Sequence, residues 1–376
     1  MGRSPDCAVK KPLPLPLRAA FVLLLVLGQG VCAGFGPPQL AARDFDSTAL
    51  WPEQVRELVA VGRQPQVDAK AALLIDMGSK AVLYEKNGTR RLPQASTTKM
   101  MTALVALERG NLSDTVVIEP GDLVVASAAG LRAGEMWTLG DLLYALMLPS
   151  DNAAAVVIAR HVGGSEAAFV DMMNSKAAEW GLTDTHFANP HGLDDPAHHS
   201  SARDLAQIAM RGLAEPRFAA IVSTAEREAG GRTLRNLNQL LGSYVGAEGV
   251  KTGTTEGAGQ CLVALAGRGE GRVLSVVLGS DDRYRDTRAL LDYYYANYRT
   301  VPLDLGPKGI NVIRRSDGSK AVLALEGQPT ALLPLWQLPW LQVLRVTPGA
   351  EGTAGMARFV AGGTLLAEEP LNALSP

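Results

Sequence analysis

The sequence predicts an α/β (α+β) fold, in which helices cover a β-sheet, followed by a small all-β domain. Two strand-like runs precede the main helical region, and further strand-like runs follow it. After Thr300 the helical periodicity fades, and Gly and Pro punctuate short apolar runs. Helices gathered between the strands of one sheet are typical of a sheet with helical cover. With 376 residues, the chain is long enough for two domains.

The sheet is expected to begin with a hairpin. The runs Ala71–Asp76 and Lys80–Glu85 have the apolar character of strands, and Met77–Ser79 joins them. A helix is then expected over Met100–Leu107, where apolar residues recur at helical spacing before Gly110.

The middle of the chain alternates between helical and strand-like patterns. After a short strand at Thr115–Ile118, three helices are expected at Thr138–Leu148, Ala153–His161 and Phe169–Trp180. Later strands are expected at Val250, Leu262–Leu265 and Val273–Leu278, and a closing helix is expected at Arg288–Tyr298.

The predicted β-domain covers residues 301–376. Short apolar runs at Ala321–Leu325 and Leu341–Val346 alternate there with turn residues, as in small all-β domains. Trp336 and Trp340 could touch a membrane surface, which leaves peripheral membrane association open, but packing in a small core is favoured.

The N-terminus has the pattern of an export signal. Basic residues precede the apolar run Ala19–Leu27, and Val31-Cys32-Ala33 follows it. This predicts a signal peptide over residues 1–33, although the same run could stay uncleaved as an anchor. Residues 34–69 are expected to form a linker and an N-terminal segment. The protein is therefore expected in the periplasm or on the outer face of the cytoplasmic membrane.

Composition excludes several classes of function. The net charge is −2 and no basic stripe is present, so nucleic acid is a poor partner. Cys261 is the only cysteine beyond the leader, so the mature chain forms no internal disulfide. It lies in an apolar run, as a buried small hydrophobic residue does. The C-terminal stretch Glu368–Pro376 is too short and proline-bounded for an amphipathic membrane helix.

The stretch Ser96-Thr97-Thr98-Lys99 is the first candidate for chemistry. On a helix, Ser96 and Lys99 share one face, so a nucleophilic hydroxyl and an amine base can meet. The helix N-terminus favours an oxygen anion there, and the apolar flank favours a lowered lysine pKa. The S-x-x-K pattern alone also occurs on ordinary helix surfaces.

Two further triplets complete a motif set. Ser150-Asp151-Asn152 follows Pro149 in an expected loop, and Lys251-Thr252-Gly253 is expected at the start of a strand. Separately, each triplet also fits a helix cap or a turn. In this order, the three motifs are those of serine β-lactamases and penicillin-binding proteins.

On these motifs the chain resembles the low-molecular-weight penicillin-binding proteins, specifically the D-alanyl-D-alanine carboxypeptidases. Flanking segments resemble those of the same family, namely Arg91–Met100, Phe187–Leu193, His199–Leu205 and Gly246–Gly253. The resemblance implies a β-lactamase/transpeptidase-like sheet with an all-helical lobe. It places a penicillin-binding serine carboxypeptidase domain over residues 70–300.

The resemblance also implies catalytic roles. Ser96 would be the acyl-accepting nucleophile and Lys99 would take its proton. Ser150 would relay a proton to the leaving amine, and Asn152 would hold the substrate's amide.

The remaining residues implied by the resemblance bind substrate. Lys251 would supply a fixed positive charge, and Thr252 and Gly253 would form a strand edge for the peptide. The backbone N–H of Thr254, where the family often has His, would join that of Ser96 in an oxyanion hole. An arginine near Arg285 would bind the substrate carboxylate, and several arginines lie nearby.

The implied reaction is removal of the terminal D-alanine from peptidoglycan stem peptides through an acyl-enzyme, without metal or organic cofactor. β-Lactams would acylate the same serine. Two alternatives stay open. A serine β-lactamase would need a positioned carboxylate, whereas Glu166 and Asp171 fall on an ordinary helix. A catalytically idle scaffold protein would differ from a carboxypeptidase only in its lack of activity. The loop His191–His199 could also suggest a metal site, but a polar loop is favoured.

Overall fold

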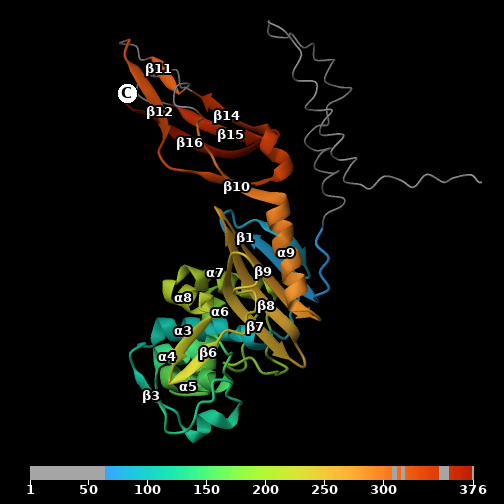
Figure 1. Ribbon diagram of the computed structural model, residues 1–376, viewed down its shortest axis with the longest axis vertical. Coiled ribbons are helices and arrows are strands. Elements are labelled where there is room, and N and C mark those ends of the chain that lie inside the picture. The colour runs from blue at the N-terminus through green and yellow to red at the C-terminus, as the bar shows by residue number, and fades with distance from the viewer. Residues whose placement is uncertain (1–63, 307–310, 315–317, 347–354, 375–376) are drawn as a thin grey trace, which may run out of the picture. The chain divides into compact units, whose positions relative to one another are not determined.

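The computed structural model describes residues 64–306, 311–314, 318–346 and 355–374 (Figure 1). The predicted signal peptide and most of the predicted linker lie outside the described residues.

A five-stranded antiparallel sheet forms the centre of the region before the predicted β-domain. Its strand order is β2-β1-β9-β8-β7, and the strands are β1 (Ala71–Asp76), β2 (Val82–Lys86), β7 (Ala247–Thr255), β8 (Gly259–Arg268) and β9 (Gly271–Ser280). The predicted hairpin of β1 and β2 is confirmed. Pairing of Leu73 with Val276 joins this hairpin to strands from much later in the chain.

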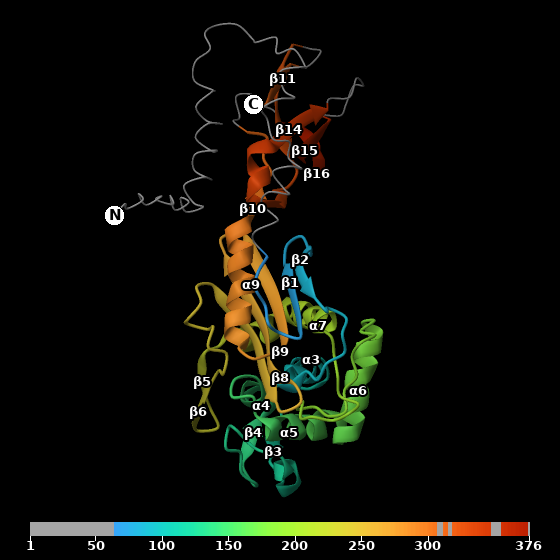
Figure 2. The same cartoon turned by 90° about the vertical axis from the view of Figure 1, so that its right-hand side faces the viewer.

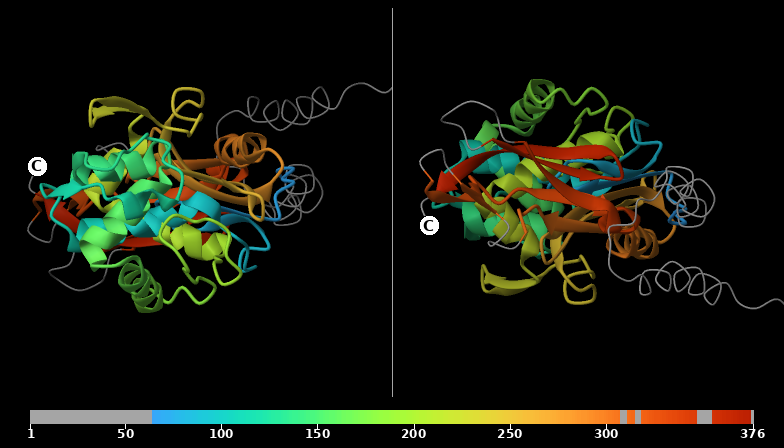
Figure 3. Two further views of the ribbon diagram at one scale, coloured as in Figure 1. Left: turned by 90° about the horizontal axis from the view of Figure 1, so that it is seen from below. Right: turned by 90° about the horizontal axis from the view of Figure 1, so that it is seen from above.

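Both faces of this sheet are buried. Leu73 and Ile75 of β1 belong to the core shared with the helical region, whereas Ala72 and Leu74 pack in the core beneath α9 (Arg283–Asn297). Figure 2 shows α9 on one side of the sheet and α7 (Ala202–Ala214) on the other, and the end-on views agree (Figure 3). Burial on two sides explains why these strands are apolar throughout rather than alternating.

The predicted helices of this region are confirmed, with shifted ends. They are α3 (Lys99–Arg109), α4 (Leu139–Met147), α5 (Asn152–Gly163) and α6 (Glu166–Glu179). α6 begins before the expected Phe169 because the Ser165 side chain accepts a hydrogen bond from Ala168 N. α9 likewise begins before the expected Arg288 because the carboxylate of Asp282 caps it.

Shorter elements complete this region. A one-turn helix, η1 (Ala95–Thr98), leads into α3, and α8 (Pro216–Ser223) follows α7. Small antiparallel pairs join β3 (Thr115–Val117) to β4 (Met136–Thr138) and β5 (Glu226–Ala229) to β6 (Arg232–Arg235). Of these strands, only β3 was expected.

In the described part of the chain, no single helix is long and apolar enough to cross a membrane. The pair α5 and α6, bent by 85° at its junction, passes the same test together by length and composition.

The C-terminal region has a sheet of its own, drawn in orange to red in Figure 1. Its order is β11-β12-β16-β15-β14, with bounds Val312–Arg314, Lys320–Leu325, Thr364–Leu374, Met356–Ala361 and Leu341–Val346. A second pair joins β10 (Tyr298–Pro302) to β13 (Thr330–Pro334). Leu303, Leu323 and Phe359 belong to a separate apolar core. The all-β character of this region is confirmed, and the boundary at residue 301 stays a prediction.

Candidate active site

The nucleophile motif lies on a strained turn. Ser96 and Thr97 belong to η1, and Lys99 is the first residue of α3. Thr97 Oγ1 donates to Gln94 O at 2.7 Å, and Thr98 Oγ1 donates to Ala95 O at 2.8 Å. Ala95 has a φ of 50°, a value that is rare for a residue with a side chain. These bonds hold the turn in a conformation that the backbone alone disfavours.

Lys99 is fully buried, and its hydrogen-bond partners among the described residues are neutral oxygens. Its Nζ lies 2.9 Å from Ser96 Oγ, 2.7 Å from Asn152 Oδ1 and 2.6 Å from the carbonyl oxygen of His191. Burial, and next the charge of Lys251, lower the pKa of Lys99 well below its ordinary value. A lysine in this state can accept the proton of the Ser96 hydroxyl.

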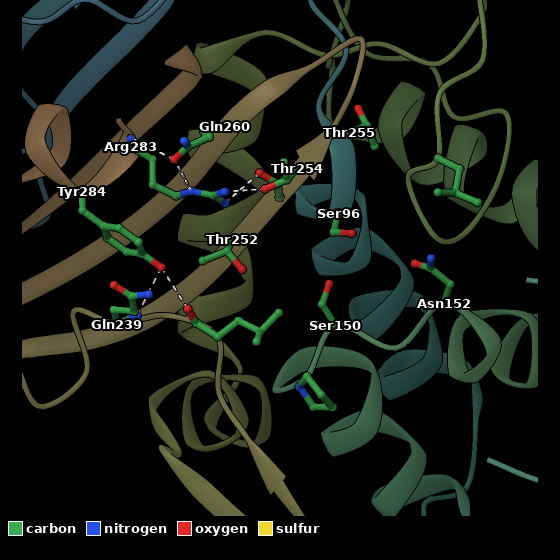
Figure 4. A pocket seen from close by; sticks show the side chains of 14 residues that line it. Ser96, Ser150, Asn152, Gln239, Thr252, Thr254, Thr255, Gln260, Arg283 and Tyr284 are labelled. Carbon is green, nitrogen blue, oxygen red and sulfur yellow. Dashed lines mark hydrogen bonds between the residues drawn. The ribbon is translucent and has the colours of Figure 1, made fainter. Parts of the chain in front are cut away.

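In the second triplet, the Asp151 side chain stabilises the local structure, whereas the Ser150 side chain points into the space beside Ser96. Asp151 caps α5 by accepting from Ala154 N, and its other oxygen accepts from Ser127 Oγ and Ala129 N, each at 2.6 Å. Ser150 has a φ of 62°, and its buried Oγ has no hydrogen-bond partner among the described residues. Figure 4 shows the Ser150 and Ser96 hydroxyls pointing into the same space.

The third triplet lies in the middle of β7, so its expected position at the start of a strand is wrong. Pairing with β8 begins at Ala247, before the apolar residues that suggested the strand. β7 is an edge strand beside the nucleophile turn. A Cβ on Gly253 would lie 2.9 Å from Ser96 N and 3.0 Å from Ala95 Cβ. Only glycine lets the strand and the turn approach this closely.

Lys251 is buried beside this edge, and its charge depends on its surroundings. Its Nζ donates to Thr252 O at 3.1 Å. Burial, and next the charge of Arg283, lower the pKa of Lys251 to about 7. The role of Lys251 as a fixed positive charge stays a prediction, and an anion bound nearby would favour the charged form of its amine.

A cavity of about 530 Å³ joins the three motifs. Six predicted residues line it, namely Ser96, Ser150, Asn152, Thr252, Gly253 and Thr254. The two other predicted residues, Lys99 and Lys251, are buried and contact its lining residues. The structure thus brings all eight into one site.

The arginine at this cavity is Arg283. Its Nη1 donates to Gly253 O at 2.8 Å and to Cys261 O at 3.1 Å, and its Nη2 donates to Thr254 Oγ1. Arg285 instead pairs with Asp68 at 2.6 Å and Asp286 at 3.2 Å, and it does not line the cavity. The sequence did not distinguish the two, because only the start of α9 decides which one faces β7. Cys261 is buried, as expected.

Two histidines of the loop His191–His199 contact the nucleophile motif, because the His191 carbonyl binds Lys99 and His198 binds Thr98. Buried His198 lies 2.7 Å from Thr98 Oγ1 through Nε2, and its Nδ1 accepts from Ala188 N. Burial lowers the pKa of His191 and of His198 to about 4. Within the described residues, no group of three or more His, Cys, Asp or Glu side chains is placed to hold a metal ion.

Gly192 of the same loop is expected to be irreplaceable. It has a φ of 89°, and a Cβ there would lie 2.1 Å from Ala95 O. Gly192→Ala should lower the free energy of unfolding by about 2–5 kcal/mol, from backbone strain plus overpacking. It should also slow acylation, because the neighbouring carbonyl of His191 holds Lys99.

The matched control is Gly181→Ala. Gly181 also has a positive φ, 69°, but a Cβ there meets nothing within 4 Å. It should cost only about 1–2 kcal/mol of strain. Urea unfolding and penicillin labelling of both variants check the prediction, and equal losses would show that the contact with Ala95 is unimportant.

Comparison with known proteins identifies the family. The family model described as D-alanyl-D-alanine carboxypeptidase, peptidase S11, matches residues 59–282. The chain belongs to this family. It is a serine D-Ala-D-Ala carboxypeptidase of peptidoglycan and a penicillin-binding protein.

Individual carboxypeptidases are similar over most of the chain. D-alanyl-D-alanine carboxypeptidase DacF of Bacillus subtilis is 35% identical over 71% of this chain and 72% of its own length. DacC of Escherichia coli is 32% identical over 85% of this chain and 84% of its own. The crystal structure of penicillin-binding protein 6B from Escherichia coli matches with a TM-score of 0.67 and 28% identity, covering 84% of this chain and 97% of that one. The carboxypeptidase fold therefore includes the C-terminal β-domain.

Proposed function

We propose that Ser96 is the acyl-accepting nucleophile of this carboxypeptidase and that Lys99 takes its proton. The observation that carries this proposal is the 2.9 Å hydrogen bond between Lys99 Nζ and Ser96 Oγ. The lowered pKa of Lys99 supports it, because a neutral amine is the form that can accept a proton. Asn152 Oδ1 and the His191 carbonyl orient the amine from two other directions.

The reaction then proceeds in two transfers. Ser96 Oγ attacks the carbonyl carbon between the two terminal D-alanines while Lys99 takes the hydroxyl proton. The N–H groups of Ser96 and Thr254 stabilise the oxyanion that forms. Ser150 relays this proton from Lys99 to the amine of the departing D-alanine, the C–N bond breaks, and an ester remains on Ser96. Water then attacks the ester while the neutral Lys99 takes a proton from it. That proton returns to Ser96 Oγ as the C–O bond breaks, which releases the shortened stem peptide.

The rest of the cavity binds the substrate. The Arg283 guanidinium and Thr254 Oγ1 lie together at one end and suit the terminal carboxylate. Lys251 and Thr252 lie beside them, so the carboxylate would also hold the proton on Lys251. Asn152 holds the stem peptide's amide, and the edge of β7 pairs with its backbone.

Slow deacylation separates a carboxypeptidase from a β-lactamase. Among the described residues, no carboxylate lines the cavity. Glu166 instead lies 3.9 Å from His191 Nε2, and Glu179 pairs with Lys176 at 2.9 Å. Without a cavity carboxylate to activate water against this bulky ester, the penicilloyl adduct should survive for minutes or longer, whereas Lys99 assists release of the smaller peptidyl ester.

Mass spectrometry tests this proposal. A penicilloyl adduct should remain on the peptide that contains Ser96, and a diacylated tripeptide ending in D-Ala-D-Ala should release D-alanine. Rapid multiple-turnover loss of penicillin without D-alanine release would favour the β-lactamase alternative. Neither adduct nor D-alanine would favour an idle scaffold.

We also propose that the protein acts outside the cytoplasmic membrane. Its peptidoglycan substrate lies there, and residues 1–33 have the pattern of a signal peptide. N-terminal sequencing of protein from fractionated cells tests the proposal. A start at Gly34 would indicate cleavage, an intact leader in the membrane fraction would indicate a tether, and a purely cytosolic protein would contradict export.

A further inference from the structure

Gln260 at the start of β8 holds the arginine of the active site. Its Oε1 accepts from Arg283 Nε at 3.1 Å and from Arg283 N at 3.4 Å. Its Nε2 donates to the carbonyl oxygen of Asp281 at 2.8 Å. Figure 4 shows the Gln260 and Arg283 side chains joined in this way. One amide therefore fixes both the guanidinium and the backbone that carries it.

The neighbouring Asp282 carboxylate acts on Arg283 only through space, and the hydrogen-bond acceptors of Arg283 among the described residues carry no negative charge. They are Gln260 Oε1, Gly253 O, Cys261 O and Thr254 Oγ1, and all four are neutral. Burial disfavours the charged form and lowers the pKa of Arg283. A half-buried guanidinium held by neutral groups attracts an anion more strongly than one already paired with a carboxylate.

We propose that Gln260 is a positioning and specificity residue, which holds Arg283 in a fixed geometry and keeps it free for the substrate's terminal carboxylate. This inference rests on the proposed role of Arg283. The amide is suited to both tasks, because it supplies an acceptor to Nε without adding a negative charge. It also directs Arg283 toward β7, where Thr254 Oγ1 meets Nη2.

Two substitutions separate these tasks. Gln260→Glu keeps an acceptor of the same shape near Nε, adds a charge that competes with the substrate carboxylate, and loses the N–H donor to Asp281 O. Gln260→Leu removes the acceptor and leaves Arg283 Nε and Asp281 O without this partner. The same exchange at Gln342, exposed on β14, gives the matched control Gln342→Glu.

The test measures KM and kcat for a diacylated tripeptide ending in D-Ala-D-Ala. Gln260→Glu should raise KM by about tenfold, as expected for the loss of one charge-assisted hydrogen bond, with a much smaller change in kcat. Gln260→Leu should raise KM in the same direction, and Gln342→Glu should leave both constants unchanged. Thermal unfolding of each variant identifies any loss that comes from folding.

A double-mutant cycle with Arg283→Gln decides the mechanism. If Gln260 acts through Arg283, the uncharged variant Gln260→Leu should have no further effect on KM once Arg283 is replaced. An equal increase in both backgrounds would overturn the inference in favour of a structural role in the β9–α9 turn. A normal KM in Gln260→Glu, with a raised KM in Arg283→Gln, would overturn the inference alone. A normal KM in Arg283→Gln would instead refute the proposed role of Arg283.

Discussion

Replacing Ser96 by alanine should abolish covalent labelling by a fluorescent penicillin and release of D-alanine from the tripeptide. Ser96 Oγ is the only atom of the motif set that the proposed mechanism uses to form the ester, so no slower route should remain. Folding should be unaffected, because the bonds that hold η1 come from Thr97 and Thr98 rather than from Ser96. Gel fluorescence, an assay for D-alanine and thermal unfolding check the three expectations.

The control for this prediction is Ser175→Ala, which removes an exposed hydroxyl from α6. It should keep wild-type labelling. Undiminished labelling of Ser96→Ala would refute the assignment of the nucleophile. Loss of labelling together with a large fall in melting temperature would show that Ser96 supports the fold instead.

Replacing Lys99 by methionine should slow acylation by roughly 10²–10⁴-fold, the range expected for a general base. Met fills a similar volume but cannot accept the Ser96 proton. In the wild type, the acylation rate should rise with pH and level off above the lowered pKa of Lys99, because only the neutral amine acts as a base. This dependence should be missing from the residual rate of Lys99→Met. The rate of penicillin labelling as a function of pH measures both.

Stability should respond to the same substitution in a pH-dependent way. The folded-state pKa of Lys99 is lowered, so below the unfolded-state value of about 10.4 the unfolded chain binds this proton more readily. The free energy of unfolding of the wild type should therefore increase relative to that of Lys99→Met as the pH rises toward 10. Urea unfolding at several pH values measures the difference, with exposed Lys320→Met as control. A pH-independent difference would contradict a lowered pKa of Lys99 in the folded protein.

The sequence alone predicted the fold class, the family and the eight residues that the structure brings to one cavity. This was possible because the three motifs are short and local. Ser96 and Lys99 are three residues apart, so one turn of helix is enough to bring them together. The main strands were also predicted from apolar runs such as Leu262–Leu265, and only the structure shows that both of their faces are buried.

Only the tertiary structure decided how these motifs meet and what surrounds them. The choice of Arg283 over Arg285 depends on the Asp282 cap and on the side of α9 that faces β7. The role of Gln260 depends on a contact between β8 and the chain beyond β9. The charge of Lys251 depends on burial and on a neighbouring arginine distant in sequence. Long-range packing sets each of these features, and a local pattern carries no record of which distant group will be the neighbour.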